Sequence, residues 1–77
     1  MDNKKDISVD SFVDDTGRNI PTCIQWTNGK NYVIRRILHT CVSSNLDYEG
    51  ICYTVQIGKQ QKNIYYSNGK WYILLSG

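Results

Sequence analysis

The sequence contains one histidine and three cysteines, the residue types that most readily supply a nucleophile, a base or a metal ligand. His39 and Cys41 are two residues apart, so on a β-strand both side chains would point to the same face. Their backbones would then lie about 7 Å apart, which is too far for an activated Cys–His pair. We therefore predict that the protein is not an enzyme.

The same residues have the ligand types of a zinc site, but they lack closely paired ligands such as Cys-x-x-Cys. No glycine-rich phosphate loop is present, and no pair of carboxylates is placed for acid–base chemistry. We expect no cofactor, no metal and no small-molecule substrate, although the sequence leaves open whether four side chains converge on a metal: Cys23, His39, Cys41 and Cys52.

Charge is unevenly distributed along the chain. Residues 1–15 contain two lysines and five aspartates, whereas residues 16–77 contain seven Lys or Arg residues and two acidic ones. This segregation predicts an acidic arm and a basic body, with residues 1–6 forming a flexible acidic arm. The alternative is that these are ordinary solvated surface charges.

Aromatic and basic residues suggest a binding function. Tyr65 and Tyr72 alternate with the apolar residues around them, so we expect them on an exposed face where they could stack on bases beside Lys or Arg. The candidate binding face comprises Lys30, Arg35, Arg36, Lys62, Tyr65, Lys70 and Tyr72.

The net charge of +2 is modest for a nucleic-acid-binding protein. We therefore predict a non-catalytic binding module for a protein partner or for a second copy of the chain, with exposed aromatic residues as anchors. Nucleic-acid binding and a purely structural role are the alternatives.

These side chains must be positioned by short strands, because β-branched and aromatic residues occur in brief runs and no window keeps apolar residues at helical spacing for three turns. Asp14 to Gly17 is predicted to form the first turn, and 58–62 a later one. The six predicted strands are 7–13, 22–27, 32–42, 51–57, 63–67 and 71–75.

The third run changes its apolar phase. Tyr32 and Ile34 are at even-numbered positions and would face one side of a regular strand, whereas Ile37 is at an odd-numbered position and would face the other. A bulge or bend near Arg35-Arg36 would explain the change. Such a bend lets one strand serve two faces of a small barrel. We predict one all-β domain spanning residues 1–77, an SH3-like or partly open β-barrel of five to six antiparallel strands.

Two Asn-Gly dipeptides predict tight hairpin turns. The surrounding segments, QWTNGKNYVI from Gln25 and YYSNGKWYIL from Tyr65, resemble each other in register. Either a duplication or the shared chemical demands of a tight turn explains the similarity.

From Ile7 onward, the segments ISV, DDTGR, IPTCIQWTNGKNYVIRRIL and IYYSNGKWYIL resemble short bacterial proteins that form a domain-of-unknown-function family. Cys41 stands near a position where those relatives often carry Trp. The resemblance implies a compact β fold in bacteria and transfers no functional residue. The matching residues are Pro21, Trp26, Gly29, Tyr32, Leu38, Trp71 and Tyr72.

The odd number of cysteines, the polar opening MDNKKD and the lack of an apolar signal segment predict a cytoplasmic protein with reduced thiols. No apolar run approaches the roughly 20 residues that cross a bilayer, so we expect no membrane association.

Overall fold

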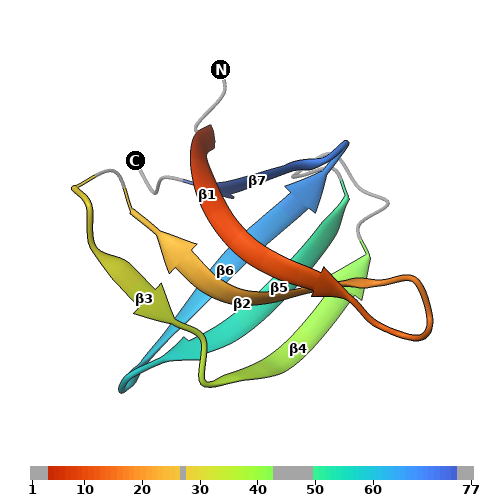
Figure 1. Ribbon diagram of the computed structural model, residues 1–77, viewed down its shortest axis with the longest axis horizontal. Helices are drawn as coiled ribbons and strands as arrows, with labels where there is room; N and C mark the ends of the chain where they lie inside the picture. Colours follow the sequence, from red (N-terminus) through yellow and green to blue (C-terminus); the bar gives the residue numbers. More distant parts are fainter. Residues whose placement is uncertain (1–3, 27, 43–49, 75–77) are drawn as a thin grey trace.

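The computed structural model describes residues 4–26, 28–42 and 50–74, and within these ranges the chain folds entirely into strands and turns. The strands form one curled antiparallel sheet, a half-barrel, which confirms the predicted all-β class (Figure 1). The described residues contain no helix that is long and apolar enough to cross a membrane. The seven strands are β1 (Lys4–Val13), β2 (Asn19–Gln25), β3 (Asn31–Val33), β4 (Arg36–Val42), β5 (Ile51–Ile57), β6 (Gln60–Ser67) and β7 (Lys70–Leu74).

The sheet order is β3-β2-β1-β7-β6-β5-β4, so β1 joins the first and last parts of the chain. The first half of β1 pairs with β7, ending with Ile7 opposite Trp71. From Ser8 onward the strand pairs with β2, with a register shift between Asp10 and Ser11. Because it serves both neighbours in turn, β1 curves around the barrel (Figure 1).

The predicted bend in the third run divides it into two strands. The backbone N–H of Ile34 donates to the carbonyl oxygen of Thr22 in β2 at 2.9 Å. The next N–H, that of Arg35, donates to the carbonyl oxygen of Gln56 in β5 at 2.8 Å. One peptide step thus transfers the chain from one edge of the sheet to the other, and the described strands number seven instead of the predicted five to six.

A second irregularity follows in β4, where the pairing with β5 shifts between Ile37 and His39. Leu38 therefore has no partner of its own in the ladder, as expected for a bulge. The bulge comes after Ile37, so the change of apolar phase between Ile34 and Ile37 arises from the step between strands at Ile34-Arg35, and the bulge shifts the phase of the residues that follow it.

The core lies on the concave side of the curled sheet. Tyr53, Val55 and Ile64 are fully buried, and Ile24 and Trp71 complete the cluster. The Trp71 ring centroid lies 5.4 Å from that of Tyr53, and the planes are tilted by 44°. Because the core is so small, these aromatic rings supply a large part of the buried apolar area.

The two Asn-Gly dipeptides both connect neighbouring antiparallel strands, as predicted, but their turns differ. Asn68 and Gly69 both have positive φ, 54° and 79°, which is the two-residue turn of a tight hairpin. At the first hairpin, Gly29 has φ 84° and its N–H donates a hydrogen bond to the carbonyl oxygen of Trp26. The connection there is a longer loop with a left-handed glycine.

Two predicted boundaries shift. The turn expected over 58–62 occupies only Gly58 and Lys59, because β6 already begins at Gln60 opposite Ile57. The flexible acidic arm expected over residues 1–6 does not include residues 4–6, since Lys4, Lys5 and Asp6 pair with β7. Residues 1–3 of that predicted arm lie outside the described residues.

Candidate functional site

A groove of about 620 Å³ opens between the β2–β3 and β5–β6 hairpins. Figure 1 shows these two hairpins facing each other on the side of the molecule where β3 lies. The lining comes from β2, β3, β5, β6 and β7 and from the residues next to them, so segments far apart in the sequence meet around the groove. Its lining residues are Ile24, Trp26, Tyr32, Ile57, Gly58, Lys59, Gln60, Lys62 and Ile73.

The floor of the groove is apolar. Ile24 is buried, and Ile57, Ile73 and Trp26 pack partly against the core cluster. Tyr32 stands at the edge of the groove and is 36% exposed, so part of its ring is available for contact. An apolar concave surface with a few polar groups at its rim is typical of a ligand-binding site.

The rim of the groove is positively charged. Lys59 and Lys62 line it and are exposed. The ammonium nitrogen of Lys5 lies 5.0 Å from the ring centroid of Trp26, within cation–π range. No Asp or Glu belongs to the described lining, so the groove favours a ligand that combines apolar and negatively charged groups.

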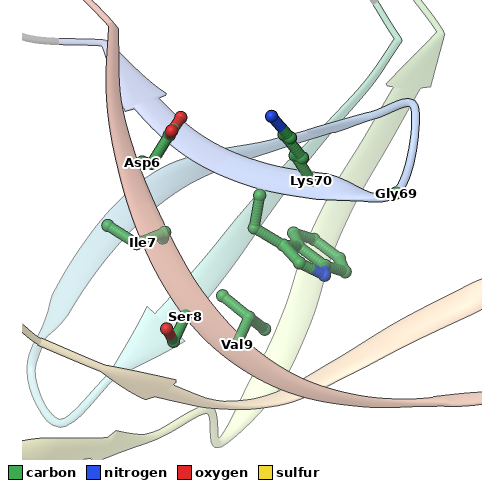
Figure 2. Close-up of a pocket in the computed structure, with 7 residues that line it drawn as sticks. Asp6, Ile7, Ser8, Val9, Gly69 and Lys70 are labelled. Carbon is green, nitrogen blue, oxygen red and sulfur yellow. The ribbon is translucent and has the colours of Figure 1, made fainter.

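A second, smaller hollow of about 320 Å³ lies where β1 leaves β7. Pairing of the two strands ends at Ile7 and Trp71, and the gap opens between Ser8 and the β6–β7 turn. Figure 2 shows Asp6 and Lys70 projecting from the two strands beside this hollow. Because its lining includes one aspartate and one lysine, the hollow has no single electrostatic preference.

Tyr65 and Tyr72 do not form the exposed aromatic face that the sequence predicts. They are opposite each other in the β6–β7 ladder and their rings stack with centroids 5.2 Å apart and planes 16° apart. The predicted alternation with Ile64 is confirmed, but the two tyrosines are only 8% and 4% exposed. The ammonium nitrogen of Lys4 also covers Tyr72, at 4.9 Å from its ring centroid. The expectation that these two rings lie on an exposed face is therefore wrong.

The basic residues of the predicted face are all exposed but do not share one site. Lys62 lines the groove, whereas Lys70 lies at the seam between β1 and β7. Arg35 and Arg36 follow the bend between β3 and β4, and Lys30 lies in the β2–β3 turn.

The sequence did not predict four residues of the groove. Ile57 and Ile73 give it its shape, and Lys5 and Lys59 give it its charge. Alternation places the two isoleucines on the interior face, in the same pattern as fully buried Val55. Only the curl of the sheet decides which interior residues remain accessible at its open end.

Within residues 4–26, 28–42 and 50–74, no group of three or more His, Cys, Asp or Glu side chains is placed to hold a metal ion. Cys23 is on β2 and is separated from the other two cysteines, which face each other on β4 and β5. His39 and Cys41 are both exposed on β4, which is an edge strand.

Comparisons of the chain with protein-family models, with curated proteins and with solved structures found no match. The resemblance to the bacterial family of unknown function stays a prediction.

Proposed function

We propose that the protein is a non-catalytic binding module that holds an apolar segment of a partner protein, flanked by acidic residues, in the groove between its β2–β3 and β5–β6 hairpins. The observation that carries this proposal is the combination of an isoleucine-rich floor with a lysine rim that contains no carboxylate among its described residues. Apolar side chains of the partner would enter the floor beside Trp26 and Tyr32, and Lys59 and Lys62 would attract the acidic flanks.

A protein ligand fits this groove better than a nucleic acid. Ile24, Ile57 and Ile73 present aliphatic surface, which is suited to aliphatic and aromatic side chains. The two tyrosines that would have provided base stacking are buried. Nucleic-acid binding through the lysines alone is the competing function, and it would depend strongly on salt.

We also infer that the half-barrel is of the SH3-like kind and that the protein works in the bacterial cytoplasm. The strongly bent segment 31–42, which contributes to both edges of the sheet, supports the barrel assignment. The cytoplasmic location is supported by the odd number of cysteines, which leaves at least one thiol unpaired.

The test begins with selection from a random peptide display library on the immobilised full chain, followed by solution titration of the selected synthetic peptides. We expect the enriched peptides to share an apolar centre with acidic flanks and to change the fluorescence of Trp26. Enrichment of basic peptides, or of no common pattern, would contradict the proposal.

Paired variants localise the binding. Ile57→Asp and Lys62→Glu are each expected to weaken the selected peptide about tenfold or more, because one places a charge in the apolar floor and the other reverses the rim. Lys70→Glu makes the same charge change at the seam and should leave the affinity within about twofold. Equal losses in Lys62→Glu and Lys70→Glu would show that binding depends on overall charge and not on the groove.

A single-stranded oligodeoxythymidine is titrated at two salt concentrations in parallel. Binding that is tighter than that of the peptides and falls steeply with salt would favour the nucleic-acid function.

A further inference from the structure

Two cysteines face each other across neighbouring strands on the side of the sheet opposite the core. Cys41 of β4 and Cys52 of β5 are direct partners in the antiparallel ladder, and Cys52 is in turn opposite Tyr65 of β6. Directly opposite residues project from the same face of a sheet, so the side chains of Cys41, Cys52 and Tyr65 all lie on one face. Both thiols are free, with Cys41 exposed and Cys52 half-buried.

This arrangement has the backbone spacing of a disulfide. Directly opposite residues in antiparallel strands have Cα atoms about 4.5 to 5.5 Å apart, and bonded cysteines have Cα atoms about 4.4 to 6.8 Å apart. A bond between Cys41 and Cys52 therefore needs side-chain rotation and little movement of the strands. Cys23 has no such option, because its partners in the ladders are Asp10 and Val33.

We propose that Cys41 and Cys52 form a reversible cross-strand disulfide by exchange with a low-molecular-weight disulfide such as oxidised glutathione. The site is independent of the groove and of the function proposed for it. β4 is an edge strand, so oxidation would tie this edge covalently to β5.

The exchange proceeds in two balanced steps. The thiolate of exposed Cys41 attacks one sulfur of oxidised glutathione, which breaks its disulfide bond and releases one glutathione thiolate. The thiolate of Cys52 then attacks the Cys41 sulfur of the mixed disulfide and releases the second glutathione. The two cysteines lose two electrons and two protons, and glutathione disulfide is reduced to two thiols.

The accessible cysteine is expected to react first. Burial raises the pKa of the Cys52 thiol, and the nearby Cys41 raises it further, while a hydrogen bond with Tyr65 partly offsets the shift. Cys52 is therefore the resolving thiol, and formation of the Cys41–Cys52 disulfide should accelerate as pH rises toward the pKa of Cys52.

The chain offers a direct assay for this bond. No Lys or Arg lies between Arg36 and Lys59, so trypsin releases both cysteines in one peptide, 37–59, whereas Cys23 is in peptide 19–30. The native protein is treated with oxidised glutathione, quenched in acid, denatured, alkylated, digested and examined by mass spectrometry. We expect peptide 37–59 to escape alkylation and to have a mass about 2 Da below that of its reduced, unalkylated form, while peptide 19–30 is alkylated.

Variants and a denatured control complete the test. Cys23→Ser should still form the bond, and Cys52→Ser should stop with glutathione attached to Cys41. The bond should form at least about tenfold faster in the native protein than in concentrated urea, because the folded strands hold the thiols opposite each other. Three results would overturn the proposal: a fully alkylated peptide 37–59, a bond that links the two peptides, or equal rates with and without urea.

Discussion

The hydroxyl of Tyr53 donates a hydrogen bond of 2.5 Å to the backbone carbonyl oxygen of Asn19. Tyr53 is on β5 and Asn19 on β2, and three strands, β1, β7 and β6, lie between them in the sheet. The bond therefore crosses the interior of the half-barrel and fastens its two sides to each other. Because the Tyr53 side chain is fully buried, its hydroxyl depends on this partner.

Replacing Tyr53 with Phe should lower the free energy of unfolding by about 1 to 2 kcal/mol, since the buried ring remains but the carbonyl of Asn19 loses its donor. Chemical denaturation at neutral pH measures this loss. A variant as stable as the wild type would show that the bond makes no net contribution.

The same variant should respond differently to alkaline pH. Burial raises the pKa of Tyr53 above its usual value of 10.0, so its contribution is complete below that pH and is lost as pH rises through the folded-state pKa. The stability advantage of the wild type over Tyr53→Phe should therefore shrink above pH 10. A constant difference between the two proteins over this range would contradict the expectation.

The β1–β2 turn should make the stability of the protein sensitive to acid. One carboxylate oxygen of Asp14 accepts hydrogen bonds from the Thr16 hydroxyl at 2.6 Å, the Thr16 N–H at 2.9 Å and the Arg18 N–H at 3.0 Å. These donors, the Thr16 hydroxyl first, lower the pKa of Asp14 below 3.8. Its contribution to stability is therefore present above pH 3.8 and is lost as pH falls through the folded-state pKa.

Asp14→Ala should accordingly be less stable than the wild type at pH 7, with a difference that disappears in strong acid. Asp15→Ala is the matched control, because Asp15 is exposed and accepts none of these bonds. Thermal unfolding of the three proteins between pH 2 and 7 measures both effects. A loss that is equal in the two variants, or independent of pH, would contradict the role assigned to the turn.

Local patterns in the sequence predict the strands well because alternation and turn residues act over a few neighbours. The run 51–57 is recovered without error, and the parity break at Ile37 correctly predicts irregular pairing in the bent segment. The same dipeptide, however, gives a two-residue turn at Asn68-Gly69 and a longer loop at Asn28-Gly29. Turn type depends on how the flanking strands pair, which the dipeptide alone does not determine.

The candidate site was harder to predict because it depends on curvature. Alternation shows that Tyr65 and Ile64 face opposite sides of the sheet, but it does not show whether the outer side is exposed to water. It likewise cannot separate Ile57, which lines the groove, from Val55, which is fully buried two residues earlier. Both distinctions arise from long-range packing.

Among the glycines that the structure describes, Gly50, directly before β5, permits the closest backbone approach. It has φ 93°, and a Cβ atom there would lie 2.0 Å from the carbonyl oxygen of Tyr66 and 2.9 Å from the Cβ of Ser67. The first obstacle is backbone in β6, so it cannot be relieved by rotating a side chain. The start of β5 can therefore lie against β6 only when this residue lacks a side chain.

Gly50→Ala should consequently cost about 3 kcal/mol or more, since it combines an unfavourable φ with a backbone clash. Gly17→Ala is the matched control, because Gly17 has a similar φ of 84° but no atom within 4 Å of an added Cβ. That control should lose only about 1 to 2 kcal/mol, the usual cost of a left-handed alanine. Denaturant unfolding gives both values, and a Gly50→Ala chain that fails to fold while Gly17→Ala folds would agree with the prediction. Equal losses in the two variants would show that the contact between Gly50 and Tyr66 does not constrain the fold.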